Sequence, residues 1–465
     1  MNEINRSINI AYIGGGSTNY CWKFIGEICQ EPSLCGTVKL YDIDKKLSLN
    51  NEVIGNRTRE LPESKTEMIF IAVDTLEEAL RDSDFVIISI SVGDLETQLT
   101  DIQIPESYGI LQAVGNNTGP GGILRAMRIV PEYVNLANMI KENCPNAWVI
   151  SLSEPMSACV KTLYTIYPEI KAFGCSNDIF SAQELLADIV AQKNNISSVS
   201  RREIKTNVIG INKFCFINEA MYNGDNLFDI YAEFVDKYAS DGYEKQRQDY
   251  KNNPNASAHK VKFDMFLRYG LIAASSDKYL AENCPPWYLL NSKAIAFWKI
   301  GITSPAFLKR LRAEKLAKQK RILMCEESLH IGWSGTDCIN QIKAIMGMTN
   351  IITNLVTINK GQVANLPIGS IVETNALLSK NNVKPVYAGI IPNSIAVLIN
   401  RQVENNNMLV DAIISKNIDQ VFNVFLNDPL MTLDINKATE LYRQMLSVNS
   451  AYFGYYNKEL VDSVV

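Results

Sequence analysis

The chain has 465 residues, more than one hydrophobic core usually serves, so we expect two closely packed lobes. Its hydrophobic content of 47% and charged content of 20% are those of an ordinary globular protein, and the net charge of −5 argues against a nucleic-acid partner. No apolar run reaches the roughly 18–20 residues that span a bilayer, so the sequence also argues against a membrane partner.

The amino-terminal part predicts alternating strands and helices. Its first residues, MNEINRSINIAYIGGG, lack the charged, apolar and small segments of a signal peptide. The strands are predicted at INIAYIG (8–14), TVKLYDID (37–44), MIFIAV (68–73), DFVIISIS (84–91) and AWVISLS (147–153). Because helix-length segments such as PEYVNLANMIKENC separate these strands, we expect a parallel sheet with both faces covered.

The carboxy-terminal part predicts longer helices joined by irregular loops. EIKTNVIGIN (203–212) is expected to form another strand. Helices are expected within SAHKVKFDMFLRYG (257–270) and FLKRLRAEKLAKQKRILMCEES (307–328), the second with a charged face and an apolar stripe. We place the boundary between the lobes near residue 200, which gives an amino-terminal domain of residues 1–200 and a carboxy-terminal domain of residues 201–465.

Cysteine and histidine usage predicts a reduced, cytoplasmic protein. The ten cysteines include no CxxC pair and have no regular spacing, so we interpret them as reduced and mostly buried. With only two histidines, His259 and His330, a histidine-rich metal site is not expected.

A dinucleotide site is predicted where the first strand meets the first helix, in YIGGGSTNY. Glycines there permit a tight turn, and the following helix amino terminus faces phosphates. Asn19 stands where the usual fingerprint has its third glycine, so a glycine turn of another α/β protein is the alternative. An acid at the end of the second strand binds ribose hydroxyls and disfavours a 2′-phosphate, so NAD is preferred to NADP. The residues predicted to bind the cofactor are Gly14, Gly15, Gly16, Ser17, Asp42, Val92 in ISVGD, and Asn117.

The chain resembles glycoside hydrolase family 4, a family of NAD-dependent glycosidases. The resemblance covers about residues 8 to 450 and is carried by IGGGSTNY, VGNNTGPGGILRAMRIVP, SEPMSACV, FGCSNDIFSAQ, GINKF and LPIGSIVETNALL. SAHKVKFDMFLRYGLIAASSDKYLAE and FLNDPL resemble the branch that acts on α-galacturonides and α-glucuronides. The resemblance implies a doubly wound, Rossmann-type parallel sheet in the first lobe, a mainly helical α+β second lobe, and a homodimer or homotetramer.

The resemblance also implies a mechanism in which redox chemistry cleaves the glycosidic bond. In this mechanism, hydride passes from C3 of the sugar to NAD. A base, usually tyrosine, then removes the C2 proton, and a divalent metal stabilises the resulting enolate. The leaving group at C1 is eliminated from this enolate. Water then adds, and the hydride returns to the sugar. The implied substrate is a small sugar or glycoside.

This chain departs from the family at the metal. The family's metal-binding cysteine lies in a Cys-His pair that matches Ser176–Asn177, and its metal-binding histidine matches Lys213. The family's Asn-Pro-Met reads Glu154-Pro155-Met156 here, and the last two positions of an Asp-Arg-His segment are Lys278 and Tyr279. A shift by one residue, which would make Cys175 a ligand, is the alternative alignment. We therefore expect no bound divalent metal.

Lys213 and Glu154 are expected to form an ion pair at the vacated metal position, because a buried lysine without a counter-charge loses its proton. The pair either polarises a substrate carbonyl or carboxylate, or fills an inactive site. Asn177 and Glu154 are predicted to contact substrate.

The remaining candidates each have a structural alternative. Tyr269 in FLRYG is predicted to be the catalytic base, with a core aromatic residue as the alternative. Arg125 and Arg128 are predicted to contact the sugar, with a solvated or salt-bridged helix face as the alternative.

Three functions follow from these observations. The first is a metal-independent, family 4-like glycosidase that uses NAD and acts on a uronide, with Lys213, Tyr269 and Glu154 as catalytic residues. The second is an NAD-dependent sugar oxidoreductase or epimerase. The third is an NAD-binding pseudoenzyme.

Overall fold

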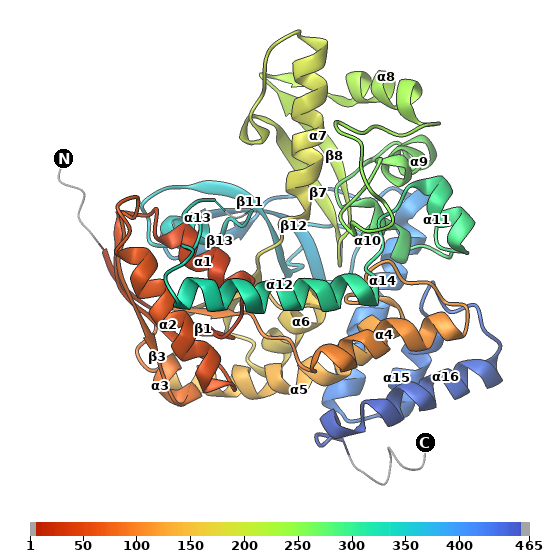
Figure 1. Ribbon diagram of the computed structural model, residues 1–465. Helices are drawn as coiled ribbons and strands as arrows, with labels where there is room; N and C mark the ends of the chain where they lie inside the picture. The colour runs from red at the N-terminus through yellow and green to blue at the C-terminus, as the bar shows by residue number, and fades with distance from the viewer. Residues whose placement is uncertain (1–5, 334, 457–465) are drawn as a thin grey trace.

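The computed structural model describes residues 6–333 and 335–456. Its main element is a nine-stranded sheet with the order β13-β12-β11-β6-β5-β4-β1-β2-β3 (Figure 1). Its strands are β1 (Arg6–Ile13), β2 (Leu34–Tyr41), β3 (Glu67–Ala72), β4 (Phe85–Ile88), β5 (Trp148–Ser151), β6 (Lys171–Gly174), β11 (Ile351–Ile358), β12 (Ile371–Ser379) and β13 (Asn382–Pro385). The six strands from β6 to β3 pair in parallel. The predicted parallel α/β sheet is therefore confirmed, and its strand order reverses between β1 and β4, where such sheets bind ligands.

Helices cover both faces of this sheet, as the strand–helix alternation predicts. The helices in the described part of the chain, some of which pack on the second sheet described below, are α1 (Tyr20–Ile28), α2 (Lys45–Arg59), α3 (Leu76–Leu80), α4 (Leu95–Ser107), α5 (Gly119–Asn143), α6 (Met156–Ile166), α7 (Asp178–Lys193), α8 (Phe228–Tyr238), α9 (Lys260–Tyr269), α10 (Asp277–Glu282), α11 (Ser292–Trp298), α12 (Pro305–Leu323), α13 (Cys338–Ile345), α14 (Asn393–Ile414), α15 (Ile418–Leu426) and α16 (Ile435–Val448). Strand β1 shows the cause: Ile10 and Tyr12 pack with α1, α2 and α13, whereas Ala11 and Ile13 pack with α3, α5 and α6. A strand that is apolar on both faces needs a helix layer on each.

A smaller antiparallel sheet projects above the main one in Figure 1. It consists of β7 (Lys205–Ile211), β8 (Phe214–Tyr222), β9 (Asp225–Asn226) and β10 (Ile272–Ala273). Helices α7, α8 and α9 pack against it around Phe234 and Phe263. The turn between β7 and β8 points back toward the main sheet, and this placement brings its residues to the site described below.

The carboxy-terminal half returns to the main sheet. Strands β11, β12 and β13 add to β6 in antiparallel pairs and continue the sheet of the amino-terminal half. The sequence analysis missed these strands, although it anticipated two helices of the carboxy-terminal half, α9 and α12. The predicted combination of a parallel sheet with a helical carboxy-terminal part is confirmed, and the boundary near residue 200 stays a prediction. No helix in the described part of the chain is both long and apolar enough to cross a membrane.

Candidate active site

A small pocket lies at the carboxyl ends of the parallel strands, where β5 and β6 stop. Such strand ends are where open α/β sheets bind ligands. The residues that line the pocket are Tyr20, Leu152, Glu154, Met156, Cys175, Ser176, Asn177, Asp178, Lys213 and Thr336. The pocket therefore joins the FGCSNDIFSAQ segment, the SEP turn and the β7–β8 turn, which the sequence analysis placed at one site.

The glycine loop after β1 is built for close backbone approach. Gly14 has a φ of +94°, and a Cβ there would lie 2.2 Å from the carbonyl oxygen of Ser89. A Cβ on Gly15 would lie 2.8 Å from Cβ of Leu40. The backbone N–H groups of both glycines donate to the carbonyl of Tyr41, at 2.9 and 2.8 Å. The loop thus has room for no side chain between β2 and β4, which is the geometry that a dinucleotide-binding turn requires.

Asp42 lies directly beside this loop. Its carboxylate accepts hydrogen bonds from the backbone N–H groups of Gly16, at 2.9 Å, and Asp44, at 3.0 Å. Burial raises the pKa of Asp42 in spite of these bonds. Ser17 Oγ accepts from the N–H of Asn19 at the start of α1. An acid at the end of β2 next to a helix amino terminus fits the adenosine side of a dinucleotide.

We expect Gly14→Ala to abolish the thermal shift that NAD causes and to lower the melting temperature. The new methyl group would meet Ser89 at a φ that side chains rarely adopt, so the loop must move. Gly109→Ala is the matched control, because Gly109 also has a positive φ, of +84°, but no atom within 4 Å of the new Cβ. Differential scanning fluorimetry with and without NAD measures both effects. Equal NAD shifts in the two variants would contradict the assignment of the loop.

Lys213 lies in the pocket between two carboxylates. Its Nζ is 2.7 Å from Glu154 Oε1 and 3.4 Å from Asp178 Oδ2, and the three side chains are only 13–14% exposed. Burial acts to lower the pKa of Lys213, but Asp178 and Glu154 outweigh it and hold the pKa well above its usual value. The predicted Glu154–Lys213 ion pair is therefore present, and Asp178 is a second partner that the sequence analysis did not name.

The β7–β8 turn explains how a lysine reaches this position. Asn212 and Lys213 are the only residues between the two strands, and both have a positive φ, of +54° and +60°. Two-residue hairpin turns of this kind place both residues in the left-handed region. The backbone N–H of Lys213 also donates to Glu373 at 3.2 Å, which fixes the turn to β12.

Glu373 is a buried carboxylate behind the pocket that the sequence analysis missed. Its oxygens accept hydrogen bonds from the hydroxyl of Ser176 and from Cys215 Sγ, the latter at 3.0 Å. Burial, and then the charge of Asp178, raise its pKa. The available signal was an acid within IVETNALLS, a segment flanked by apolar residues, because buried charges are rare unless they have partners.

The residues at this site do not fit a divalent metal ion. Ser176 directs its hydroxyl to Glu373, and Asn177 donates to the carbonyl of Gly335 at 2.8 Å. Lys213 places a protonated ammonium beside the two carboxylates. Burial raises the pKa of Cys175, the alternative ligand, to about 12, and a protonated thiol does not bind metal. Within residues 6–333 and 335–456, no group of three or more His, Cys, Asp and Glu side chains is arranged to hold a metal ion.

The tyrosines that face Lys213 are Tyr279 and Tyr20, not Tyr269. The Nζ of Lys213 is 4.2 Å from the centre of the Tyr279 ring. Tyr20, at the start of α1, lines the pocket. Tyr269 lies at the end of α9, where it packs against a different part of the core. This placement corresponds to the core-aromatic alternative for Tyr269, and burial raises the pKa of all three phenols.

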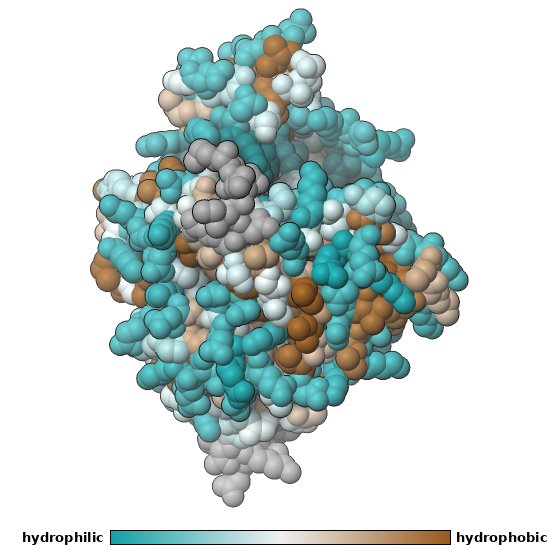
Figure 2. Space-filling model, turned by 90° about the vertical axis from the view of Figure 1, so that its left-hand side faces the viewer, coloured by the Kyte–Doolittle hydropathy of each residue, from teal (hydrophilic) through white to brown (hydrophobic). Residues whose placement is uncertain are grey.

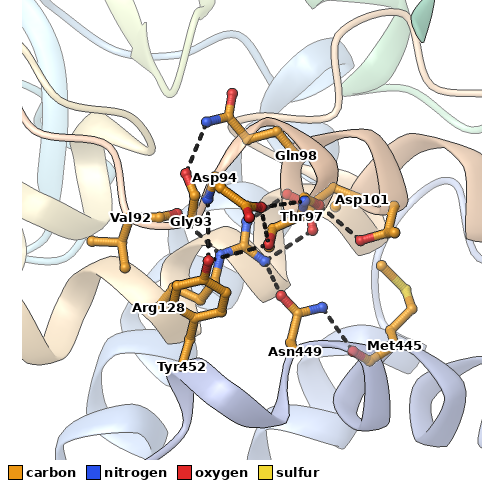
Figure 3. A network of polar contacts seen from close by, with 12 residues as sticks. Val92, Gly93, Asp94, Thr97, Gln98, Asp101, Arg128, Met445, Asn449 and Tyr452 are labelled. Carbon is orange, nitrogen blue, oxygen red and sulfur yellow. Dashed lines mark hydrogen bonds and ion pairs between the residues drawn. The ribbon is translucent and has the colours of Figure 1, made fainter. Parts of the chain in front are cut away.

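Arg128 is fully engaged in a buried network (Figure 3). Its Nη1 and Nη2 contact the two Asp101 carboxylate oxygens at 2.9 and 2.5 Å, and its Nε donates to the carbonyl of Val92 at 3.2 Å. Nη1 also donates to Asn449 at 2.5 Å. The network ties the loop after β4, which carries the predicted cofactor residue Val92, to α4, α5 and the carboxy-terminal helix. The structure therefore corresponds to the salt-bridged alternative for Arg128: four of its five N–H groups are bonded within the protein, and its side chain is fully buried away from the pocket solvent.

Arg125 remains available, one turn earlier on α5. It forms no ion pair with any described residue, and its buried Nε has no hydrogen-bond partner. Burial lowers the pKa of Arg125, and the charges of Asp101 and, to a smaller extent, Glu154 act against this.

Asn117 lies in a neighbouring amide-rich pocket on the other side of the Glu154–Pro155 peptide bond. The residues that line this second pocket are Asn117, Thr118, Ile123, Pro155, Ala158, Asn212, Gln402, Asn405, Asn406, Leu409, Val424 and Asp428. Asn212 donates to the backbone carbonyl of Asn117 at 3.2 Å, whereas Asn117 Oδ1 is buried without a partner. Its predicted contact with the cofactor stays a prediction.

Two buried carboxylates hold the loop that carries Asn117. Glu282 accepts from the backbone N–H groups of Val114 and Gly115, at 2.6 and 2.8 Å. Asp428 accepts from the N–H of Gly119 at 2.9 Å. Burial raises the pKa of Glu282 to about 7 and that of Asp428 to about 6.

We expect Glu282 to make the protein less stable as pH rises toward neutrality. The folded state keeps a proton up to about pH 7 that the unfolded chain releases near pH 4.5, so the free energy of unfolding falls between these values. This one group contributes a change of up to about 3 kcal/mol. Urea unfolding at about pH 5.5 and about pH 8 should give a smaller difference for Glu282→Gln than for the wild type. The same difference in both proteins would contradict the role of Glu282.

The chain is similar along almost its whole length to known proteins. A family model described as "Family 4 glycosyl hydrolase" matches residues 9–192, and one described as "Family 4 glycosyl hydrolase C-terminal domain" matches residues 208–431. The alpha-galacturonidase of Thermoanaerobacterium saccharolyticum is 42% identical over 96% of this chain and 96% of its own length. A crystal structure of a Bacillus subtilis protein is 39% identical, with a TM-score of 0.90 over 94% of this chain and 99% of that one.

A more distant structure shares the fold. The 6-phospho-beta glucosidase of Thermotoga maritima, solved with manganese, NAD+ and glucose-6-phosphate, has a TM-score of 0.75 at 20% identity. The match covers 96% of this chain and 99% of that one.

Proposed function

The chain belongs to family 4 of the glycosyl hydrolases, and from this premise we propose that it cleaves an α-galacturonide with NAD as its cofactor and without a bound divalent metal ion. The substrate class is supported by the 42% identity to an alpha-galacturonidase over nearly the full length of both chains. The single observation that carries the metal-independent chemistry is the Lys213 ammonium, held 2.7 Å from Glu154 and 3.4 Å from Asp178.

The glycine loop and Asp42 support the cofactor. The backbone of residues 14–16 leaves the space that a pyrophosphate needs, and Asp42 would bind the adenosine ribose. When bound, NAD would supply an acceptor for the hydride at C3 of the sugar. The remote relative from Thermotoga maritima was solved with NAD+, which agrees with this use of the fold.

Lys213 would act on a substrate oxygen that gains negative charge. An ammonium has three donors, and Glu154 and Asp178 take two of them in this structure. The third donor is left for a substrate carbonyl or enolate, where a fixed positive charge in a poorly hydrated pocket lowers the energy of the developing oxyanion. The carboxylates keep the ammonium charged and fix its position.

A catalytically inactive, NAD-binding protein is the second candidate, and one observation favours it. Two carboxylates already balance the charge of Lys213, so the cluster is complete without substrate. A sugar oxidoreductase or epimerase would use the same cofactor and stop before the glycosidic bond breaks.

One assay separates these functions. We expect release of 4-nitrophenol from its α-D-galacturonide with NAD present, and none without NAD. Accumulation of NADH with the sugar but no release would indicate the oxidoreductase. A thermal shift with NAD but no turnover of galacturonides, glucuronides or galactosides would indicate the inactive protein and overturn the proposal. The homodimer or homotetramer and the cytoplasmic location stay predictions from the sequence.

A further inference from the structure

Lys278 is a second lysine near Lys213, and among the described residues it forms no ion pair. It lies in α10, next to Tyr279, and its Nζ donates to the carbonyl of Pro254 at 3.1 Å and to Asn255 Oδ1 at 2.8 Å. Both acceptors are neutral, and Lys278 forms no ion pair with any described residue. Burial, and then the charge of Lys213, lower the pKa of Lys278 to about 8, so the ammonium form still prevails at neutral pH.

The position of Lys278 ties it to the same site as Lys213. The two Nζ atoms lie 4.2 and 5.4 Å from the centre of the Tyr279 ring. The charge of Asp178 also acts on the pKa of both lysines. Two ammonium groups therefore lie near Tyr279: Lys213 is ion-paired with Glu154 and Asp178, whereas the carboxylates whose charges reach Lys278, those of Asp178 and Glu282, form no ion pair with it.

Arg125 adds to this excess of positive charge. It has no ion pair within the described residues, its Nε is unpaired, and burial lowers its pKa against the charges of Asp101 and Glu154. Lys213 lines the pocket, and Lys278 lies near the same Tyr279 ring, while Glu154 and Asp178 are both paired with Lys213. Cations that are removed from water without a counter-ion are costly, so an anionic ligand would stabilise this arrangement.

We propose that Lys278 is the specificity-determining residue that binds the carboxylate of a uronide substrate. The inference rests on the proposed function, because it assumes that a sugar acid occupies the pocket. An ammonium has three donors, and Pro254 and Asn255 take two of those of Lys278, which leaves one for the ligand. Charge-assisted hydrogen bonds of this kind are about twice as strong as neutral ones, so the carboxylate is distinguished from the hydroxymethyl group of a neutral sugar.

A phosphate of the dinucleotide is the other anion that this lysine could meet. The two sources share the chemistry of an oxyanion that accepts a hydrogen bond from an ammonium. The two contacts would affect different binding constants. Loss of a phosphate contact would weaken binding of the dinucleotide, but it would leave the preference for a uronide over a neutral sugar unchanged.

Calorimetric binding of D-galacturonate and D-galactose tests the proposal. NADH is used in place of NAD so that hydride transfer from the sugar cannot begin. We expect the wild type to bind galacturonate more tightly than galactose, and Lys278→Met to weaken galacturonate binding about 10- to 100-fold with galactose binding unchanged. Lys278→Arg, which keeps the charge, should recover part of the loss. Lys245→Met is the matched control, since it removes the same charge from an exposed pair with Asp188.

Each of the other possible binding results points to a different explanation. Galacturonate binding that is unchanged in Lys278→Met, with weaker NADH binding, would assign the lysine to the cofactor phosphate and overturn the inference alone. Equal weakening for galacturonate and galactose would show a structural role and also overturn it. If the wild type binds neither sugar, the proposed function fails, and this inference fails with it.

Discussion

Replacing Lys213 by methionine is expected to lower the turnover of an aryl α-galacturonide by about 100- to 1,000-fold, the usual effect of removing one charge-stabilising group from an active site. The substitution keeps the approximate length of the side chain and removes the cation that, among the described residues, lies within ion-pair distance of both Glu154 and Asp178. The developing oxyanion would then meet two carboxylates in place of an ammonium. Steady-state kinetics with saturating NAD measures the loss, which should fall on kcat more than on KM because the interaction strengthens toward the transition state.

A second variant separates catalysis from folding. Lys213→Met leaves two buried carboxylates without their counter-charge, so it is also expected to destabilise the protein. The double variant Lys213→Met/Glu154→Gln removes one of these charges and should recover stability without recovering turnover. The account would be contradicted if the double variant recovered turnover as well as stability. It would also be contradicted if Lys213→Met alone kept a turnover within a few-fold of the wild type, because the ammonium would then only fill the site.

Arg128→Met is expected to cost about 3–5 kcal/mol of stability, the range for removing one partner of a buried ion pair. The change would leave the buried Asp101 carboxylate without its two-pronged partner, and it would leave Asn449 and the Val92 carbonyl without a donor. A domain has only about 5–15 kcal/mol of stability in total, so this loss is a large fraction of it. Urea unfolding followed by circular dichroism gives the value.

The partner of Arg128 provides the control. In Arg128→Met/Asp101→Leu both members of the pair are apolar, and such replacements of buried ion pairs are often close to neutral. The double variant should therefore be more stable than Arg128→Met alone. A single variant within about 1 kcal/mol of the wild type would contradict the account of the network in Figure 3.

The features that the sequence predicted correctly follow local patterns. Short apolar runs separated by helix-length segments predicted the parallel sheet, and the apolar run that stops at Gly14 placed the turn after β1. The Glu154–Lys213 ion pair was predicted because two changes of opposite charge stood at positions that the family resemblance puts together.

The features that the sequence did not predict depend on contacts between distant segments. Strand β11 joins β6 across more than 170 residues, and no periodicity in IITNLVTI identifies its partner. Glu373 lies behind the pocket because its strand, β12, pairs with β11. Asp178 was not recognised as a partner of Lys213 because an acid in the first turn of a helix, here α7, is common. Tyr279, and not Tyr269, lies beside Lys213 of the β7–β8 turn. No local sequence pattern predicts this contact between distant segments.

The central claim is that an ammonium stands where the family resemblance places a metal ion. Its most direct test is the NAD-dependent turnover of an aryl α-galacturonide by protein stripped with EDTA, measured before and after manganese is added. The account predicts the same rate in both states and no stoichiometric metal in the purified protein. A stripped protein that is inactive and recovers its rate on addition of manganese would contradict it.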